Sequence, residues 1–246
     1  MKRVSVHIPC MVDTLMPNTG RSVIRLLERL DIPYIYHTNQ TCCGLPAYNA
    51  GIVPETKKVA KHFINVFGRD EVVVSTSGSC VNMIRNHYPE ILADEPDWQR
   101  RAADLSSRVF ELTQYLVDVL AIEDVGGEFK GKVAYHESCA LLRGLGVSEQ
   151  PKKLIRALKG AELVEMQHAD TCCGFGGEFA HAYHEISEEM VAEKANAFLA
   201  SGADVLTMGE PGCYLNVSGY ISRHHPDKRV VHIADLLAGL SDSQGF

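Results

Sequence analysis

The sequence contains "QTCCGLPAYNAG" at residues 40–51 and "DTCCGFGGEFAH" at residues 170–181. Both stretches place two adjacent cysteines before a glycine, and the two pairs lie 130 positions apart. The other four cysteines repeat this spacing, since Cys10 precedes Cys139 by 129 positions and Cys80 precedes Cys213 by 133. Similarity to itself at a fixed offset is the sequence signature of an internal repeat. The chain is therefore expected to consist of two related halves.

The segments around the cysteines also match between the halves. The matching pairs are VSVHIPC (4–10) with KVAYHESC (132–139), VVVSTSGSC (72–80) with DVLTMGEPGC (204–213), and RVFELTQYL (108–116) with RVVHIADLL (229–237). Two adjacent glycines in "EDVGGEFKG", at 123–131, end a helical pattern and mark the join. We therefore predict a first repeat over residues 1–125 and a second over 126–246.

Each half alternates short β-branched runs with segments of helical period, which is typical of an α/β fold with a mostly parallel sheet flanked by helices. Strands are expected at 3–9, 33–37, 71–76, 131–136, 161–167 and 203–208. Crossover helices are expected at 18–30, 54–67, 149–160 and 186–202. A longer helix over 97–120 is predicted from an apolar stripe formed by Leu105, Val109, Leu112, Leu116 and Leu120.

The composition is that of a globular protein with enough apolar material for a sizeable core. Of the 246 residues, 46% are hydrophobic and 22% are charged. The formal net charge of −7 gives no attraction for a phosphate backbone, so no nucleic-acid partner is expected. No run of apolar residues is long enough for an integral membrane span. His7 and Pro9 interrupt the only run that resembles a secretory signal, so we expect a cytoplasmic protein.

Eight cysteines in a reducing cytosol indicate metal ligands or reactive thiols rather than disulfides. Each isolated cysteine follows a predicted strand, at the edge where open α/β sheets build their sites. Adjacent side chains on a strand point to opposite faces, so a Cys-Cys pair can face one centre only if the backbone turns there. Gly44 and Gly174 permit that turn.

Four thiolates in one place repel each other unless a cation shares their charge, so the pattern favours a metal centre. Iron–sulfur clusters and structural zinc both accept four cysteines. Zinc ribbons usually use two C-x-x-C knuckles, which are absent here, so a cluster is favoured and zinc in one half stays open. The simpler alternatives are buried cysteines that only pack, and disulfides that the cytosol would reduce.

At these residues the chain resembles the cysteine-rich CCG-domain family and, within it, the lactate-utilization protein A subfamily. The resemblance is carried by TCCGLPAYNAG (41–51), SGSC (77–80), LADEPDW (92–98), ELTQYLVDVL (111–120), TCCGFGGEF (171–179) and EISEEMVAEK (185–194). More distantly, the chain is similar to the cysteine-rich subunit of heterodisulfide reductase and to the iron–sulfur subunit of glycolate oxidase.

The resemblance implies an iron–sulfur electron-transfer subunit of a complex that oxidises L-lactate to pyruvate. The implied partners are a ferredoxin-like iron–sulfur subunit and a third subunit. It implies one or two [4Fe–4S] clusters, with zinc in one repeat as the alternative occupant. The implied ligands are Cys10, Cys42, Cys43 and Cys80 in the first repeat and Cys139, Cys172, Cys173 and Cys213 in the second. The glycine-rich "CCGFGG" makes the second repeat the preferred place for a cluster.

The sequence departs from the broader family pattern at one position in each repeat. Where that pattern ends in Cys-x-x-Cys, this chain has Met83 and Asn216 in place of the last cysteine. The five-cysteine cluster of the heterodisulfide reductase relative is therefore in doubt, whereas an ordinary [4Fe–4S] cluster needs only four. Two other functions stay open: a thiol/disulfide reductase of that kind, and a zinc-stabilised scaffold subunit.

Other polar residues near the cysteines are weaker candidates. Three histidines, His7, His136 and His168, could tune a cluster or carry protons, although such residues more often have only structural contacts. Asp170 and Glu178 flank the second CCG and could serve acid–base steps, although solvated carboxylates are common in loops. "GFGGEF" lacks the third glycine of a dinucleotide fingerprint, so no nicotinamide or flavin site is expected.

Overall fold

The computed structural model describes residues 3–239, which form two four-stranded parallel sheets, one from each half of the sequence. The strand order is β2-β1-β3-β4 in the first sheet and β6-β5-β7-β8 in the second. The strands are β1 (Val4–His7), β2 (Tyr34–Tyr36), β3 (Val73–Ser75), β4 (Val109–Glu111), β5 (Glu128–Tyr135), β6 (Lys159–Val164), β7 (Val205–Met208) and β8 (Arg229–His232). The predicted α/β class with two repeats is confirmed.

Helices connect and flank the strands. In chain order they are α1 (Cys10–Leu15), α2 (Pro17–Arg29), α3 (Leu45–Asn49), α4 (Val53–Phe67), α5 (Gly78–Asn82), η1 (Met83–His87), α6 (Tyr88–Ile91), α7 (Pro96–Ser106), α8 (Leu112–Gln114), η2 (Tyr115–Val119), η3 (Ala140–Leu145), α9 (Glu149–Ala157), α10 (Glu178–Ala182), α11 (His184–Ala200), α12 (Pro211–His224) and α13 (Ile233–Ala238). None of the helices between residues 3 and 239 has the length and apolar character needed to cross a bilayer.

The long helix predicted over 97–120 is wrong. Helix α7 ends at Ser106, and the chain then forms β4, which pairs in parallel with β3 before α8 begins. Four of the five stripe residues are buried and Leu120 is partly buried, but the stripe is shared by a helix, a strand and a second helical segment. Apolar residues three and four positions apart are compatible with a helix–strand–helix succession as well as with one continuous helix. The matching segment at 229–237 has the same strand-then-helix structure, in β8 and α13.

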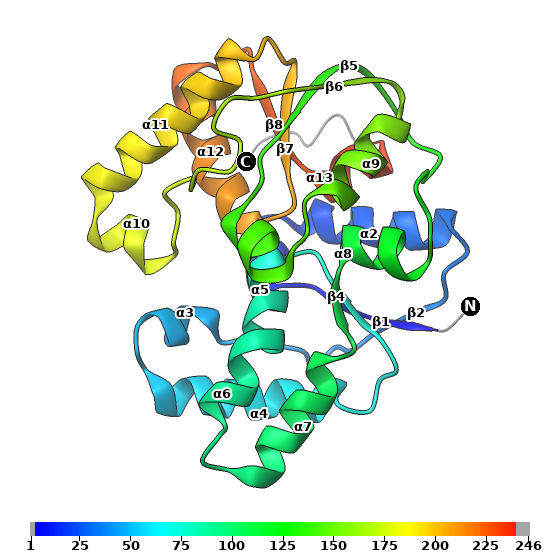
Figure 1. Cartoon of the computed structure of the whole chain (residues 1–246), viewed down its shortest axis with the longest axis vertical. Coiled ribbons are helices and arrows are strands. Elements are labelled where there is room, and N and C mark those ends of the chain that lie inside the picture. The colour runs from blue at the N-terminus through cyan, green and yellow to red at the C-terminus, as the bar shows by residue number, and fades with distance from the viewer. Residues whose placement is uncertain (1–2, 240–246) are drawn as a thin grey trace.

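A central core joins the two repeats, and each sheet has a second core on its outer face. The central core contains apolar residues of both halves, among them Val6, Leu26, Val133 and Leu236. Helices α2, α9 and α13 lie between the sheets, whereas α4 and α7 lie at one end of the molecule and α11 and α12 at the other (Figure 1). Alternate residues of a strand serve the two cores, since Val74 of β3 belongs to the central one and Val73 to the outer one.

Polar contacts between α2 and α13 also link the repeats. The buried Asp235 carboxylate accepts hydrogen bonds from Thr19 Oγ1 at 2.7 Å and from Ser22 Oγ at 2.6 Å. Arg29 donates to the carbonyl oxygens of Leu237 and Ala238, in the last turn of α13. The C-terminal helix of the second repeat is therefore fixed to the first. A division of the chain at 125/126 stays a prediction.

Replacing Asp235 with alanine should destabilise the whole chain. The Asp235→Ala variant leaves the buried Thr19 hydroxyl without its acceptor and leaves the Ser22 hydroxyl only its longer contact with the Asn18 carbonyl, at 3.1 Å. Such a loss usually costs about 1–3 kcal/mol of unfolding free energy. Urea unfolding of the full chain, followed by far-UV circular dichroism in the presence of a reductant, measures the loss. The exposed Asp227→Ala is the matched control and should change stability by less than about 0.5 kcal/mol. Equal stabilities for the two variants would contradict the proposed docking contact.

Candidate metal centre

All eight cysteines line a single cavity of about 470 Å³. The first quartet consists of Cys10, Cys42, Cys43 and Cys80, and the second quartet consists of Cys139, Cys172, Cys173 and Cys213. All eight thiols are free. The sequence predicts four thiols together in each repeat, but it does not predict that the two quartets face one common space.

The carboxyl ends of the strands deliver the cysteines to this cavity, as the sequence predicts. In the first repeat, Cys10 begins α1 after β1, and Cys80 lies in α5 after β3. In the second repeat, Cys139 follows β5 and precedes η3, and Cys213 lies in α12 after β7. Each CCG lies in the loop after the edge strand of its sheet, either β2 or β6. Because all the strands of each sheet are parallel, these ends lie along one edge.

A glycine turn directs both thiols of each Cys-Cys pair into the cavity. Gly44 and Gly174 have φ angles of +85° and +82°, a conformation that glycine adopts without strain. The Gly44 N–H donates to Cys42 Sγ at 3.3 Å, and the Gly174 N–H donates to Cys172 Sγ at 3.4 Å. The turn therefore also supplies a donor that stabilises negative charge on sulfur.

Sulfur atoms within each quartet lie in contact. The Sγ–Sγ distances are 3.5 Å for Cys10–Cys42, 3.2 Å for Cys43–Cys80 and 2.9 Å for Cys173–Cys213. These exceed the ~2.05 Å of a disulfide bond. Further contacts join the two adjacent cysteines of each pair. Each quartet is thus a continuous chain of thiols.

The first cysteine of each Cys-Cys pair is stabilised as a thiolate, and in the second quartet a hydrogen bond with Cys173 also lowers the pKa of Cys213 to about 6. Hydrogen bonds from Cys10 and Cys43 lower the pKa of Cys42 to about 2, and bonds from Cys139 and Cys173 lower the pKa of Cys172 to about 2. The thiols that donate these hydrogen bonds keep their protons more firmly, because the same contacts raise their pKa values. These thiols are Cys10, Cys43, Cys139 and Cys173. A thiolate surrounded by further thiols is the donor set of a soft metal centre.

The cysteine-rich domain family CCG matches this chain twice, over residues 4–85 and 133–218. The chain belongs to the CCG cysteine-rich family. Curated relatives named lactate utilization protein A are 43% identical in Oceanobacillus iheyensis, over 235 residues, and 44% identical in Halalkalibacterium halodurans, over 235 residues. Each alignment covers 96% of this chain and 96% of the relative.

Among solved structures, a hypothetical protein from Helicobacter pylori is similar in fold, with a TM-score of 0.57 and 11% identity. The match covers 99% of this chain and 50% of that one.

Asn216 occupies the place of the last cysteine of the broader CCG pattern and has a different role. Its side-chain amide donates to the Cys173 carbonyl at 2.8 Å. In the first repeat the Tyr88 hydroxyl makes the equivalent contact, with the Cys43 carbonyl at 2.7 Å, and Met83 is fully buried. Both positions lack a fifth thiol, and both CCG turns are held instead by a neutral donor.

Lys194 is a buried cation beside the second quartet, and sequence reasoning missed it. Its side chain is 1% exposed, and its Nζ donates to the carbonyl oxygens of His168 and Ala169. Burial lowers its pKa, while the charges of Cys173 and Cys213 act in the opposite direction. The buried faces of α4 and α11 correspond at one offset of 131 residues: Thr56, Ala60, Phe63, Ile64 and Phe67 match Ser187, Val191, Lys194, Ala195 and Phe198. Comparing the two helices at this offset would have placed Lys194 in the core, where the first repeat has Phe63.

The Glu210 carboxylate, also missed, forms part of the cavity wall between the repeats. It accepts from the Ser79 N–H at 2.8 Å and from Ser79 Oγ at 2.9 Å, and it caps the start of α12 at the Gly212 N–H. Burial raises its pKa to about 7. The sequence pattern that could have identified this residue is "GEPGC", in which an acidic residue precedes a proline. This pattern is typical of a helix start that an acidic side chain caps.

The structure separates the remaining sequence candidates into two groups. His7 and His136 are fully buried behind the quartets. His168, Asp170 and Glu178 are exposed and lie outside the lining of the cavity. His168 contributes its backbone carbonyl, which Lys194 binds, rather than its ring.

Alanine at Gly174 should disturb its repeat more than alanine at Gly44. Both substitutions place a side chain at positive φ, at a cost of about 1–2 kcal/mol. At Gly174 the new Cβ would also lie 2.8 Å from the Ser187 carbonyl oxygen, whereas at Gly44 the nearest atom is Val59 Cγ1 at 3.3 Å. Urea unfolding should therefore show the greater loss for Gly174→Ala. Equal losses would show that the close contact does not constrain the second CCG turn.

Proposed function

We propose that this chain transfers electrons in the oxidation of L-lactate to pyruvate, through [4Fe–4S] clusters held by the first and second quartets. The observation that carries the proposal is the single cavity lined by all eight cysteines. Membership of the CCG family supports it, as do the near full-length relatives named lactate utilization protein A.

The residues present fit such clusters. A [4Fe–4S] cluster takes four cysteine thiolates, and each quartet supplies four free thiols, at least one of them already stabilised as a thiolate. The N–H groups of Gly44 and Gly174 point at sulfur, which is the kind of contact that tunes cluster potentials. Zinc also accepts four thiolates, so zinc in one repeat is the alternative occupant.

When bound, such clusters supply one-electron exchange. Oxidation of L-lactate to pyruvate releases two electrons and two protons, so two one-electron sites in one cavity match its stoichiometry. The buried thiols Cys43, Cys80, Cys173 and Cys213 would hold the inner side of each site away from water. We further propose that the chain works in the cytoplasm with a ferredoxin-like iron–sulfur protein and a third subunit.

The two alternatives remain testable beside this proposal. A disulfide reductase built on a five-cysteine cluster is disfavoured, because Met83 and Asn216 stand where the fifth thiols would be. A zinc-stabilised scaffold would use the same quartets but carry no electrons.

Metal analysis of protein purified without air tests the proposal. We expect brown protein with ~4 iron and ~4 sulfide per occupied quartet, and an electron paramagnetic resonance signal on reduction. Cys43→Ala should lose the iron and the signal of the first quartet only, and Cys173→Ala those of the second only, so each variant is the control for the other. Colourless protein with stoichiometric zinc and no sulfide would instead establish the scaffold.

Growth on L-lactate tests the pathway separately. Deletion of the gene should abolish growth on L-lactate and leave growth on pyruvate unchanged. The wild-type gene should restore growth, whereas the Cys43→Ala and Cys173→Ala variants should not. Normal growth of the deletion strain on L-lactate would contradict the lactate assignment without bearing on the clusters.

A further inference from the structure

The ring of His136 is held in one tautomer. This residue directly follows β5, and its ring is fully buried. Its Nδ1 lies 3.0 Å from the Ala169 carbonyl oxygen. Because a carbonyl oxygen only accepts, Nδ1 carries the proton, and the neutral imidazole presents its lone pair at Nε2.

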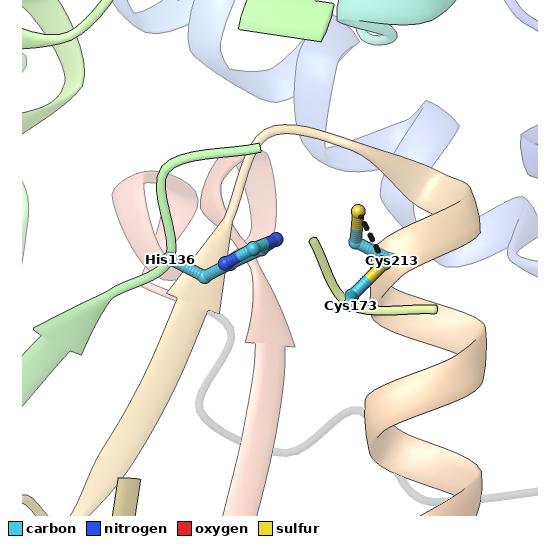
Figure 2. A group of neighbouring side chains, drawn as sticks. All are labelled: His136, Cys173 and Cys213. Atoms are coloured by element: carbon cyan, nitrogen blue, oxygen red, sulfur yellow. Dashed lines mark hydrogen bonds between the residues drawn. The ribbon is translucent and has the colours of Figure 1, made fainter. Parts of the chain in front are cut away.

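That lone pair lies beside the second quartet. Within the described part of the chain, Nε2 of His136 is buried and makes no hydrogen bond to a nitrogen or oxygen atom, and its polar neighbour is the Cys213 side chain. Figure 2 shows the ring pointing toward the thiols of Cys173 and Cys213, and the three possible ligand atoms all lie within 4.8 Å of one another. Among residues 3–239, these three side chains are the one group that meets this limit. A nitrogen lone pair buried beside a thiolate costs free energy unless a cation binds both.

Contacts behind the ring resemble those that orient histidine ligands. Metal-bound histidines usually donate their second N–H to a carbonyl or carboxylate oxygen, which fixes the ring. Here the Ala169 carbonyl receives that N–H and is itself fixed by two further donors, Lys194 Nζ at 3.2 Å and the Glu137 N–H at 3.1 Å. The buried Lys194 thus has a structural role, because it holds the Ala169 carbonyl oxygen that orients the His136 ring.

The first repeat has a different arrangement. His7 Nδ1 lies 3.0 Å from Ser75 Oγ, a hydroxyl that either donates or accepts, and the Thr41 backbone also lies against the ring. The His7 ring packs edge-on against Phe63 at 5.0 Å and Phe67 at 5.8 Å, between ring centroids. Its Nε2 also has no hydrogen-bond partner, but it belongs to no group of three ligand atoms within 4.8 Å in the described residues.

We propose that His136 Nε2 is a direct nitrogen ligand of the metal centre in the second repeat, beside Cys173 and Cys213 and in place of one of the two outer thiolates, Cys139 or Cys172, and that the first centre has thiolate ligands only. The inference rests on the proposed function, because it assumes a metal centre in the second repeat. A histidine ligand would give that centre a different electronic character from the first. Replacing anionic sulfur with neutral imidazole raises the reduction potential of an iron–sulfur centre. The second centre would therefore have the higher potential and would be the better electron acceptor of the two.

Isotope labelling of the wild-type protein tests the ligand without any substitution. Protein grown with ¹⁵N-histidine is purified without air and reduced, and pulsed electron paramagnetic resonance reads the nitrogen coupling. The signal of the second centre is the one that Cys173→Ala removes. We expect a nitrogen coupling on that signal which changes with the isotope. Absence of any isotope-sensitive coupling on the second centre, with iron and sulfide present, would overturn the inference while leaving the proposed function intact.

Asparagine variants supply the matched comparison. In His136→Asn the side-chain amide can still donate to the Ala169 carbonyl but has no group in the place of Nε2. This variant should lose the nitrogen coupling and lower the midpoint potential of the second centre, whereas His7→Asn should leave both unchanged. Coupling that survives in His136→Asn, or an equal downward shift in both variants, would contradict direct ligation. Unfolding in urea checks that each variant is folded.

If the second repeat binds zinc, X-ray absorption at the zinc edge replaces electron paramagnetic resonance as the test. X-ray absorption should then show one nitrogen ligand at ~2.0 Å beside sulfur ligands, lost in His136→Asn and kept in His7→Asn. A zinc site with sulfur ligands only would overturn the inference. A second repeat that holds neither metal would overturn both the inference and the proposed cluster in that repeat.

Discussion

The buried Glu210 carboxylate is the contact on which the common cavity depends. It accepts hydrogen bonds at the start of α5, which carries Cys80, and it caps α12, which carries Cys213. One carboxylate therefore fixes the spacing of two helix starts that are 131 residues apart in sequence, from Ser79 to Glu210. Helix N-termini favour negative charge, which offsets part of the cost of burying the carboxylate. This group thus links the helices of Cys80 and Cys213 at the wall of the common cavity.

Duplication explains most of the architecture, and the departures from it give the two sites different chemistry. Both repeats use the same strand order, the same glycine turn and the same thiolate position. The repeats differ behind the cysteines, where an aromatic cluster of Phe63 and Phe67 surrounds His7, whereas Lys194 and the Ala169 carbonyl surround His136. Two centres in such different surroundings would not share one reduction potential.

Local sequence patterns predicted much of this molecule, because each isolated cysteine follows the end of a strand. Six of the eight strands follow from β-branched runs, and the cysteine spacing placed the thiols at the sheet edges. Strands β4 and β8 were missed, β4 because Val109 and Leu112 fit a helical stripe as well as a strand followed by a helix. Glu210 and Lys194 were missed for another reason: their partners lie in the other repeat or in a distant loop, and no local pattern encodes such contacts.

Burial divides each quartet into an inner and an outer pair of thiols. Cys43 and Cys80 are buried in the first repeat, as are Cys173 and Cys213 in the second. The outer members are more accessible, and Cys139 is exposed. A group held by both pairs would be fixed on its inner side by the packed core and open on its outer side to another protein. The proposed electron exchange with a partner protein would need both properties, because the bound group must stay rigid while the partner approaches closely. The burial of one cysteine pair in each repeat and the greater exposure of the other are consistent with that proposal.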